Sequence, residues 1–109
     1  MEIRFWQTAR GRAPVAEYFE RLEASGDRRG VAAYRFLLEL LSEIGPPLGM
    51  PRDRVIDRAA RLYELRPAAH RVAYAWQGDT VWLLHAWRKQ SVTLDVRAHR
   101  TALRRLEDL

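Results

Sequence analysis

Cationic side chains lie at the ends of three predicted strands in the segment Leu62–Lys89. Arg66 closes the first strand and Arg71 opens the second. Arg88 and Lys89 follow the third. The arginine side chain is always charged, and its planar fork matches the oxygens of a phosphate group. Because only a short connection separates Arg66 from Arg71, we predict that both side chains reach one phosphate.

A structural role for these two arginines is the alternative. Each could be a surface arginine at a strand end, paired with Glu64 or Asp79. Lys89, the only lysine of the chain, could bind phosphate as a point charge or act as an acid. The tryptophans either pack in the core, where they bury a large area, or offer stacking surfaces to nucleobases.

Three histidines are the candidates for acid–base chemistry, because imidazole titrates near neutral pH. His70 opens a predicted strand, so we expect it to be exposed. His85 shares a strand face with Leu83 and Trp87 and is either packed or catalytic. His99 can approach the other groups only if the last helix folds back. The chain has no cysteine, and no residues have zinc-site spacing; we expect neither a metal nor another cofactor.

The strands that carry these groups are rich in Val, Leu, Tyr and Trp, which favour a half-buried sheet. We predict strands at Leu62–Arg66, about His70–Trp76 and about Thr80–Trp87. The turn residues Gln77-Gly78-Asp79 predict that the last two form a hairpin. The segment Arg52–Ala60 is ambiguous between a short strand and an irregular approach to the sheet.

The N-terminal half predicts one edge strand and two helices. Residues Glu2–Gln7 alternate between apolar and polar side chains, as in a strand. Pro14 suits the first turn of a helix. Asp27 can cap a second helix at about Arg28–Ile44, and Gly45, followed by two prolines, predicts its end.

The last predicted helix runs from about Leu94 to Leu106 with Thr93 as its cap. Its apolar side is thin, so it should be the least stable element, because helical stability comes mainly from a buried apolar face. Arginines crowd the remaining surface and are expected to contact RNA. The apolar residues are Val96, Leu103 and Leu106, and the arginines are Arg97, Arg100, Arg104 and Arg105.

The predicted order of elements is β-α-α-β-β-β-α in one domain, residues 1–109. This order indicates an α+β fold with a small antiparallel sheet. The two N-terminal helices should cover one face of the sheet, and the C-terminal helix should lie along an edge or end of it. We expect a cytoplasmic protein, since no apolar run approaches the roughly 20 residues that span a membrane.

The net charge of +5 is unevenly distributed along the chain. Residues 1–51 hold seven arginines and seven acidic residues, whereas residues 52–109 hold twelve cations and seven acidic residues. This excess favours a polyanionic partner, and nucleic acid in particular. The alternative is that the abundance of arginine reflects a GC-rich genome.

Four ordered motifs resemble the RelE/HigB toxin superfamily, and its phage-derived HigB-like branch in particular. They are GPPLGMP (Gly45–Pro51), LYELR (Leu62–Arg66), HRVAYAW (His70–Trp76) and VWLLHAWRK (Val81–Lys89). The resemblance covers nearly the whole chain. It implies a RelE-like fold and a type II toxin that cuts mRNA in the ribosomal A site without metal. It also implies neutralisation by a cognate antitoxin, usually of the helix-turn-helix type.

Metal-free RNA cleavage uses the 2′-OH as nucleophile and needs a base, an acid and cations for the phosphate charge. By position, the resemblance matches Arg66, Arg71 and the pair Arg88-Lys89 to basic residues of the family. The predicted catalytic residues are Arg66, Arg71, His85 and Lys89, and the predicted RNA-binding residues are His70, Arg88, Arg97, Arg100 and Arg104. No clear base emerges, so a RelE-like module that binds nucleic acid or an antitoxin without cleaving remains the alternative.

Overall fold

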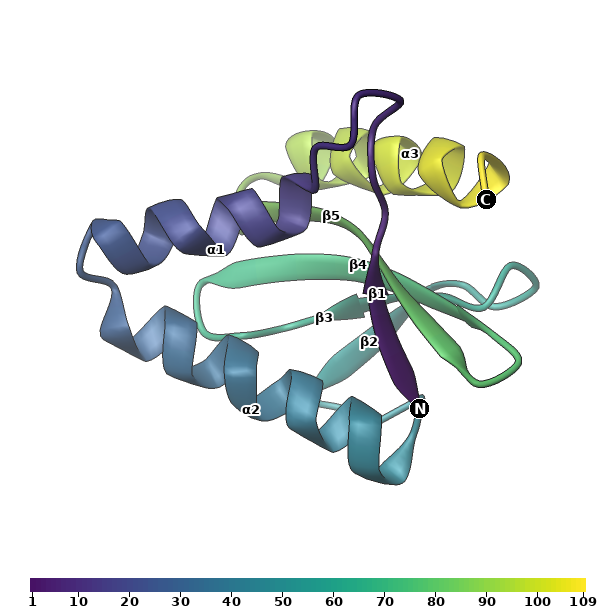
Figure 1. Ribbon diagram of the computed structural model, residues 1–109, viewed down its shortest axis with the longest axis horizontal. Helices are drawn as coiled ribbons and strands as arrows, with labels where there is room; N and C mark the ends of the chain where they lie inside the picture. The colour runs from purple at the N-terminus through teal and green to yellow at the C-terminus, as the bar shows by residue number, and fades with distance from the viewer.

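Five strands and three helices make up the chain in the computed structural model, which describes all 109 residues (Figure 1). In chain order they are β1 (Glu2–Phe5), α1 (Pro14–Ala24), α2 (Arg28–Ile44), β2 (Asp53–Asp57), β3 (Leu62–Leu65), β4 (His70–Gln77), β5 (Thr80–Arg88) and α3 (Val92–Glu107). This arrangement confirms the α+β class. No helix combines the length and the apolar character needed to cross a bilayer.

The strands form one sheet in the order β1-β5-β4-β3-β2. Strands β2 to β5 are antiparallel to their neighbours, as predicted. The edge strand β1 differs, because it pairs with β5 in the parallel direction, with Ile3 beside Val81. Strands joined by short turns must be antiparallel, but β1 and β5 are separated by most of the chain, so the sheet is mixed.

The ambiguous segment before the sheet forms the edge strand β2. Its first residue, Asp53, is buried, and its carboxylate accepts hydrogen bonds from the backbone N–H groups of Leu48 and Gly49 at 2.8 and 2.9 Å. The same carboxylate accepts the hydroxyl of Tyr74 on β4. Burial and this hydrogen bond raise the pKa of Tyr74 above its usual value. Asp53 therefore ties the loop between α2 and β2 to the centre of the sheet.

Helices α1 and α2 cover one face of the sheet. Pro14 begins α1 and the side chain of Asp27 caps α2, as predicted. The core between these helices and the strands contains Val15, Phe19, Tyr34, Leu37, Leu41, Leu65, Val72, Tyr74, Val81, Leu83 and Ala86. Apolar residues on the outer side of α2, such as Phe36 and Ile44, remain exposed.

Helix α3 covers the opposite face of the sheet, so the expectation that it would lie along an edge or end is wrong. In Figure 1 the strands lie between α2 and α3. The small side chains of Ala98 and Ala102 pack on Ala73, Ala75 and other buried residues of the sheet, and they let the helix approach closely. The buried face of α3 is thus formed by alanines and not by the larger apolar side chains of the predicted face, of which Val96 is exposed.

The N-terminus of α3 also differs from the prediction. The cap is Ser91, whose side chain accepts the backbone N–H of Leu94, and not Thr93. The helix is therefore longer than expected and begins at Val92. With either start, Asp95 lies in the first turn, where an acidic side chain is favourable.

A β-bulge in β5 redirects His85. Ala73 pairs with His85 and Tyr74 pairs with Leu83, so Leu84 is the extra residue. Because of this extra residue, Leu83 lies in the core under α1 and α2, whereas His85 contacts Arg105 of α3. The expectation that His85 and Leu83 share a face is therefore wrong. His85 does share its face with Trp87, against which its ring stacks.

Candidate active site

A row of charged side chains crosses the sheet face that α3 only partly covers. Glu64 on β3 pairs directly with Arg54 on β2, and Arg66 follows two residues later, so all three lie on this face. Because α3 packs mainly over β4 and β5, a cleft of about 260 Å³ remains between α3 and the β2–β3 edge. The cleft is lined by Arg54, Val55, Ile56, Glu64, Arg66, Lys89, Val92, Asp95, Val96 and His99.

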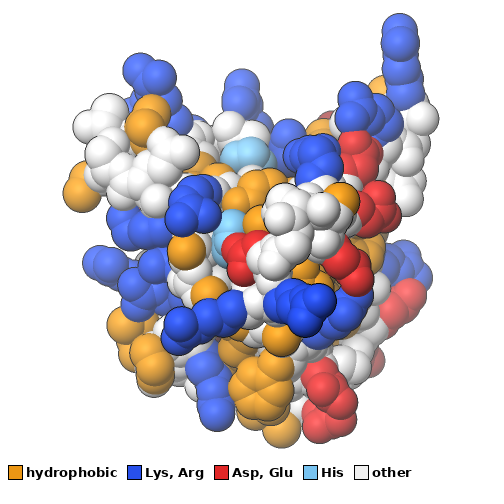
Figure 2. Space-filling view, turned by 90° about the vertical axis from the view of Figure 1, so that its left-hand side faces the viewer, with side chains coloured by type: hydrophobic (Ala, Val, Ile, Leu, Met, Phe, Trp, Pro, Cys, Tyr) orange, Lys and Arg blue, Asp and Glu red, His pale blue; other side chains and the backbone are white.

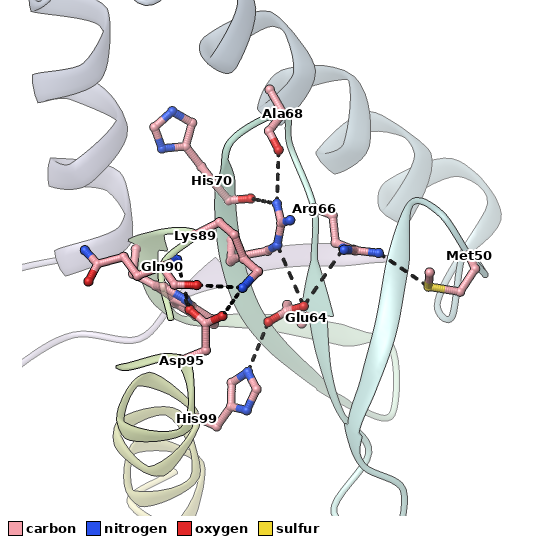
Figure 3. A network of polar contacts seen from close by, with 11 residues as sticks. Met50, Glu64, Arg66, Ala68, His70, Lys89, Gln90, Asp95 and His99 are labelled. Carbon is pink, nitrogen blue, oxygen red and sulfur yellow. Dashed lines mark hydrogen bonds and ion pairs between the residues drawn. The ribbon is translucent and has the colours of Figure 1, made fainter. Parts of the chain in front are cut away.

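The carboxylate of Glu64 is the centre of this cleft (Figure 3). One oxygen, Oε1, lies 3.0 Å from Nε2 of His99 on α3. The other, Oε2, lies 3.8 Å from Nε of Arg71 and 4.0 Å from Nε of Arg66. The side chain of Glu64 is only 8% exposed. Groups from two strands and one helix, far apart in the sequence, thus converge on a single carboxylate.

The two ion pairs of Glu64 are too long to be hydrogen bonds. Nε of Arg66 and Nε of Arg71 are both buried and have no hydrogen-bond partner. The only close hydrogen bond of the carboxylate is therefore the one with His99. Glu64 is held by charge but keeps free lone pairs, which a group that accepts a proton requires.

Arg66 and Arg71 meet at Glu64, but they differ in access to the cleft. The side chain of Arg66 is 24% exposed and that of Arg71 is 9% exposed. Nη1 of Arg71 donates to the carbonyl oxygens of Ala68 and His70 at 3.0 and 2.7 Å. Burial, together with the charge of Arg66, lowers the pKa of Arg71. Arg66 can thus contact a ligand directly, whereas direct phosphate contact by Arg71 stays a prediction.

His99 lines the cleft because α3 packs on the face of the sheet that carries Glu64. Its imidazole contacts Glu64 on one side and lies in a T-shaped arrangement with the Trp87 ring, at a centroid distance of 5.6 Å, on another. Both contacts fix the ring orientation. Of the three histidines, His99 is the one that lines the Glu64 cleft.

Lys89 also lines the cleft, at the end nearest the start of α3. Its ammonium group pairs with Asp95 and donates to the carbonyl of Gln90 at 2.8 Å. Asp95 accepts Nε1 of Trp87 at 3.0 Å as well. Although burial acts to raise it, these hydrogen bonds hold the pKa of Asp95 below its usual value. Asp95 therefore fixes both Lys89 and the indole that packs on His99.

His85 lies outside the Glu64 cleft, in a separate recess with Trp87, Gln90 and Arg97. Burial, and secondarily the charge of Arg105, lowers the pKa of His85 to about 4. The ring is therefore neutral at physiological pH. The structure does not bring His85 together with Arg66, Arg71 or Lys89, and its catalytic role stays a prediction.

His70 is buried, so the expectation that it would be exposed is wrong. Its Nδ1 lies 2.7 Å from the hydroxyl of Tyr18, and its Nε2 lies 2.9 Å from the carboxylate of Asp27. A Cβ at Gly30 would lie 2.9 Å from Oδ2 of Asp27 and 3.0 Å from the imidazole, so a side chain there would displace the His70–Asp27 contact. His70 joins α1 and α2 to β4, and its burial removes it from direct contact with RNA.

The remaining predicted RNA-binding residues, Arg88, Arg97, Arg100 and Arg104, are all exposed. Arg105 differs from its neighbours on α3. Its guanidinium group donates to the carbonyl of Leu84 at 2.8 Å and lies 4.5 Å from the centre of the Trp6 ring. Burial lowers the pKa of Arg105. The arginines of α3 therefore divide into an exposed set and one that docks the helix.

This division predicts different effects of substitution. Replacing Arg97, Arg100 and Arg104 together by Gln should leave the melting temperature within a few degrees, because exposed substitutions usually cost within about 0.5 kcal/mol. Arg105→Gln should lower it by several degrees, since a buried carbonyl loses its donor. The triple variant should bind RNA more weakly and with a flatter salt dependence. Thermal melting and RNA titrations at several salt concentrations measure both effects; equal melting temperatures for the two variants would contradict the division.

Glu64 is predicted from the sequence only as an ion-pair partner of the arginines, whereas in the structure it occupies the centre of the cleft. That ion pair exists, yet the same carboxylate also holds His99 and lines the cleft. One signal was available: an acidic residue lies within the apolar strand LYEL and two residues before Arg66. Charged residues are rarely buried unless they are paired or functional.

Comparison with known proteins supports the phage-derived part of the resemblance. Residues 17–107 match the family described as phage derived protein Gp49-like (DUF891). A search of curated proteins finds no significant match. The solved structure of the YoeB-YefM complex from Staphylococcus aureus contains a similar chain, with a TM-score of 0.58 and 12% identity. The match covers 84% of this chain and 100% of that one, and at this identity it shows a shared fold. Since the family match spans most of the sequence, the chain is a member of the phage-derived Gp49-like family.

Proposed function

We propose that this protein is the toxin of a type II toxin–antitoxin pair and a metal-independent endoribonuclease that cuts mRNA on the ribosome. The observation that carries the proposal is the convergence of Glu64, His99 and Arg66 in one cleft. The motifs shared with RelE/HigB toxins and the fold shared with a chain of the YoeB-YefM complex support it. Placement in the HigB-like branch remains part of this proposal.

The arrangement of the cleft fits acid–base cleavage of RNA. Glu64 takes the proton of the 2′-OH, and the 2′-oxygen attacks the adjacent phosphorus. Arg66 stabilises the charge that develops on the phosphate oxygens, and the buried Arg71 holds Glu64 in place. His99 gives a proton to the departing 5′-oxygen. The products are a 2′,3′-cyclic phosphate and a 5′-OH.

The surface around the cleft suits a polyanion. Figure 2 shows a face on which Lys and Arg side chains lie around a central area with His and acidic side chains, while further acidic side chains lie along the right of the view. Strands β2 and β5 and helix α3 carry exposed arginines; they are Arg54, Arg88, Arg97, Arg100 and Arg104. Such charges attract the phosphates of mRNA and rRNA and make binding sensitive to salt.

A cognate antitoxin is the proposed partner. The uneven charge of the chain leaves a cationic surface that an acidic segment of a partner can cover. The resemblance to HigB-like proteins favours an antitoxin of the helix-turn-helix type. Coexpression with the product of the adjacent gene should yield a salt-sensitive complex, and failure to associate at low salt would remove this part of the proposal.

Cleavage of mRNA by the purified chain tests the enzymatic part. The protein is incubated with an mRNA, with and without ribosomes, and the ends are mapped by primer extension and by their phosphate chemistry. Cuts that appear only with ribosomes and carry cyclic phosphate ends are expected. Ribosome or RNA binding without any cleavage would instead identify a binding module.

A further inference from the structure

The Glu64 cleft contains more than the groups that cleavage requires. Arg54 lies directly across from Glu64 in the β2–β3 pair and lines the same cleft. Every other charged side chain there has a partner: Glu64 holds His99 and Arg66, and Lys89 holds Asp95. Arg54 makes no side-chain hydrogen bond or ion pair, although its charge is fixed and its five donors are available.

Aliphatic side chains form the rest of the cleft wall. Val92 and Val96 are one helical turn apart on α3, and they are 78% and 40% exposed. Ile56 on β2 lines the same cleft. No Phe, Tyr or Trp lines it, and Trp87, which packs against His99, is buried. The cleft thus combines exposed apolar side chains with the unpaired guanidinium group of Arg54, which lies beside the proposed base Glu64.

We infer that Arg54, Ile56, Val92 and Val96 form a guanine-binding subsite next to the scissile phosphate. This inference rests on the proposed function of the cleft. A nucleobase is a flat group with apolar faces and a polar edge, so it suits aliphatic walls with donors at one end. The occupant is the base of the nucleotide whose 2′-OH reacts, because Arg54 lies beside Glu64, which takes that proton.

Guanine is the base that the guanidinium group of Arg54 matches best. Its N7 and O6 are two adjacent acceptors, which an arginine fork contacts with two hydrogen bonds. Adenine offers one acceptor and one donor on the same edge, and cytosine offers a donor. A good bidentate contact discriminates against a wrong base by about 5- to 150-fold. Single-stranded RNA exposes this edge to side chains.

Nucleoside 3′-monophosphates test the subsite without ribosomes and without cleavage. The affinities of guanosine, adenosine, uridine and cytidine 3′-monophosphate are measured by calorimetry or NMR titration. Wild-type protein should bind the guanosine compound at least about 5-fold more tightly than the others. Arg54→Ala should bind all four alike, and Val92→Asp should weaken all four by removing an apolar wall.

Arg58→Ala is the matched control, because Arg58 is an exposed arginine on the next turn and does not line the cleft. It should keep the guanine preference of wild type. Equal affinities for the four nucleotides, no binding at millimolar concentration, or a guanine preference that survives Arg54→Ala would each overturn the subsite. An intact guanine preference in a protein that cuts no mRNA would overturn the proposed nuclease activity but not the subsite.

Discussion

Glu64→Gln should lower the rate of mRNA cleavage on ribosomes by about 10²- to 10⁴-fold, the usual contribution of a general base. Glutamine has nearly the same shape but cannot accept the proton of the 2′-OH. Because the chemical step is affected, the loss should appear in kcat more than in KM. In cells the variant should no longer arrest growth on induction.

Loss of folding must be separated from loss of chemistry in this experiment. Arg71 is buried beside Glu64. Glu64→Gln removes the negative charge that pairs with Arg71, and a buried charge without its partner destabilises a protein. His99→Gln tests the same pair without removing that charge and should lower kcat by a similar factor. Glu39→Gln, an exposed glutamate on α2, serves as the control and should leave the rate unchanged. Folded Glu64→Gln protein that cleaves at the wild-type rate would exclude Glu64 as the base.

Asp53→Ala should destabilise the protein by about 3 kcal/mol or more. The substitution leaves two backbone N–H groups and the buried hydroxyl of Tyr74 without their acceptor, and each unsatisfied buried group costs about 1–3 kcal/mol. In a domain of this size the melting temperature should fall by roughly 12 °C or more. Thermal unfolding followed by circular dichroism measures the change.

Two further variants make this test specific. Tyr74→Phe removes only one of the three donors and should cost about 1–2 kcal/mol. Asp79→Ala removes an exposed carboxylate from the β4–β5 turn and should be nearly neutral. If Asp53→Ala melted within a few degrees of wild type, Asp53 would not hold the loop. The loop between α2 and β2 also places Sδ of Met50 3.7 Å from Nη1 of Arg66. If the loop lost its order, the position of Arg66 in the cleft should therefore change as well.

The local sequence determined most of the elements and the presence of cationic side chains at the strand ends. Asp27 and Gly45 mark the two ends of α2 because capping and helix termination depend on neighbouring residues. The hairpin of β4 and β5 follows from its short turn and flanking apolar residues. The same local patterns placed Arg66 and Arg71 on one side of the sheet, where both approach Glu64.

Tertiary structure alone decided which acid–base groups meet. The bulge at Leu84 turned His85 away from the face of Leu83, and its register depends on pairing with β4. Helix α3 approached the sheet through Ala98 and Ala102, which carry little signal in a hydrophobic pattern. That approach brought His99 to Glu64 across 35 positions of sequence. Periodicity and capping describe contacts within a few residues, whereas the packing of a helix on a distant strand depends on the shape of both surfaces.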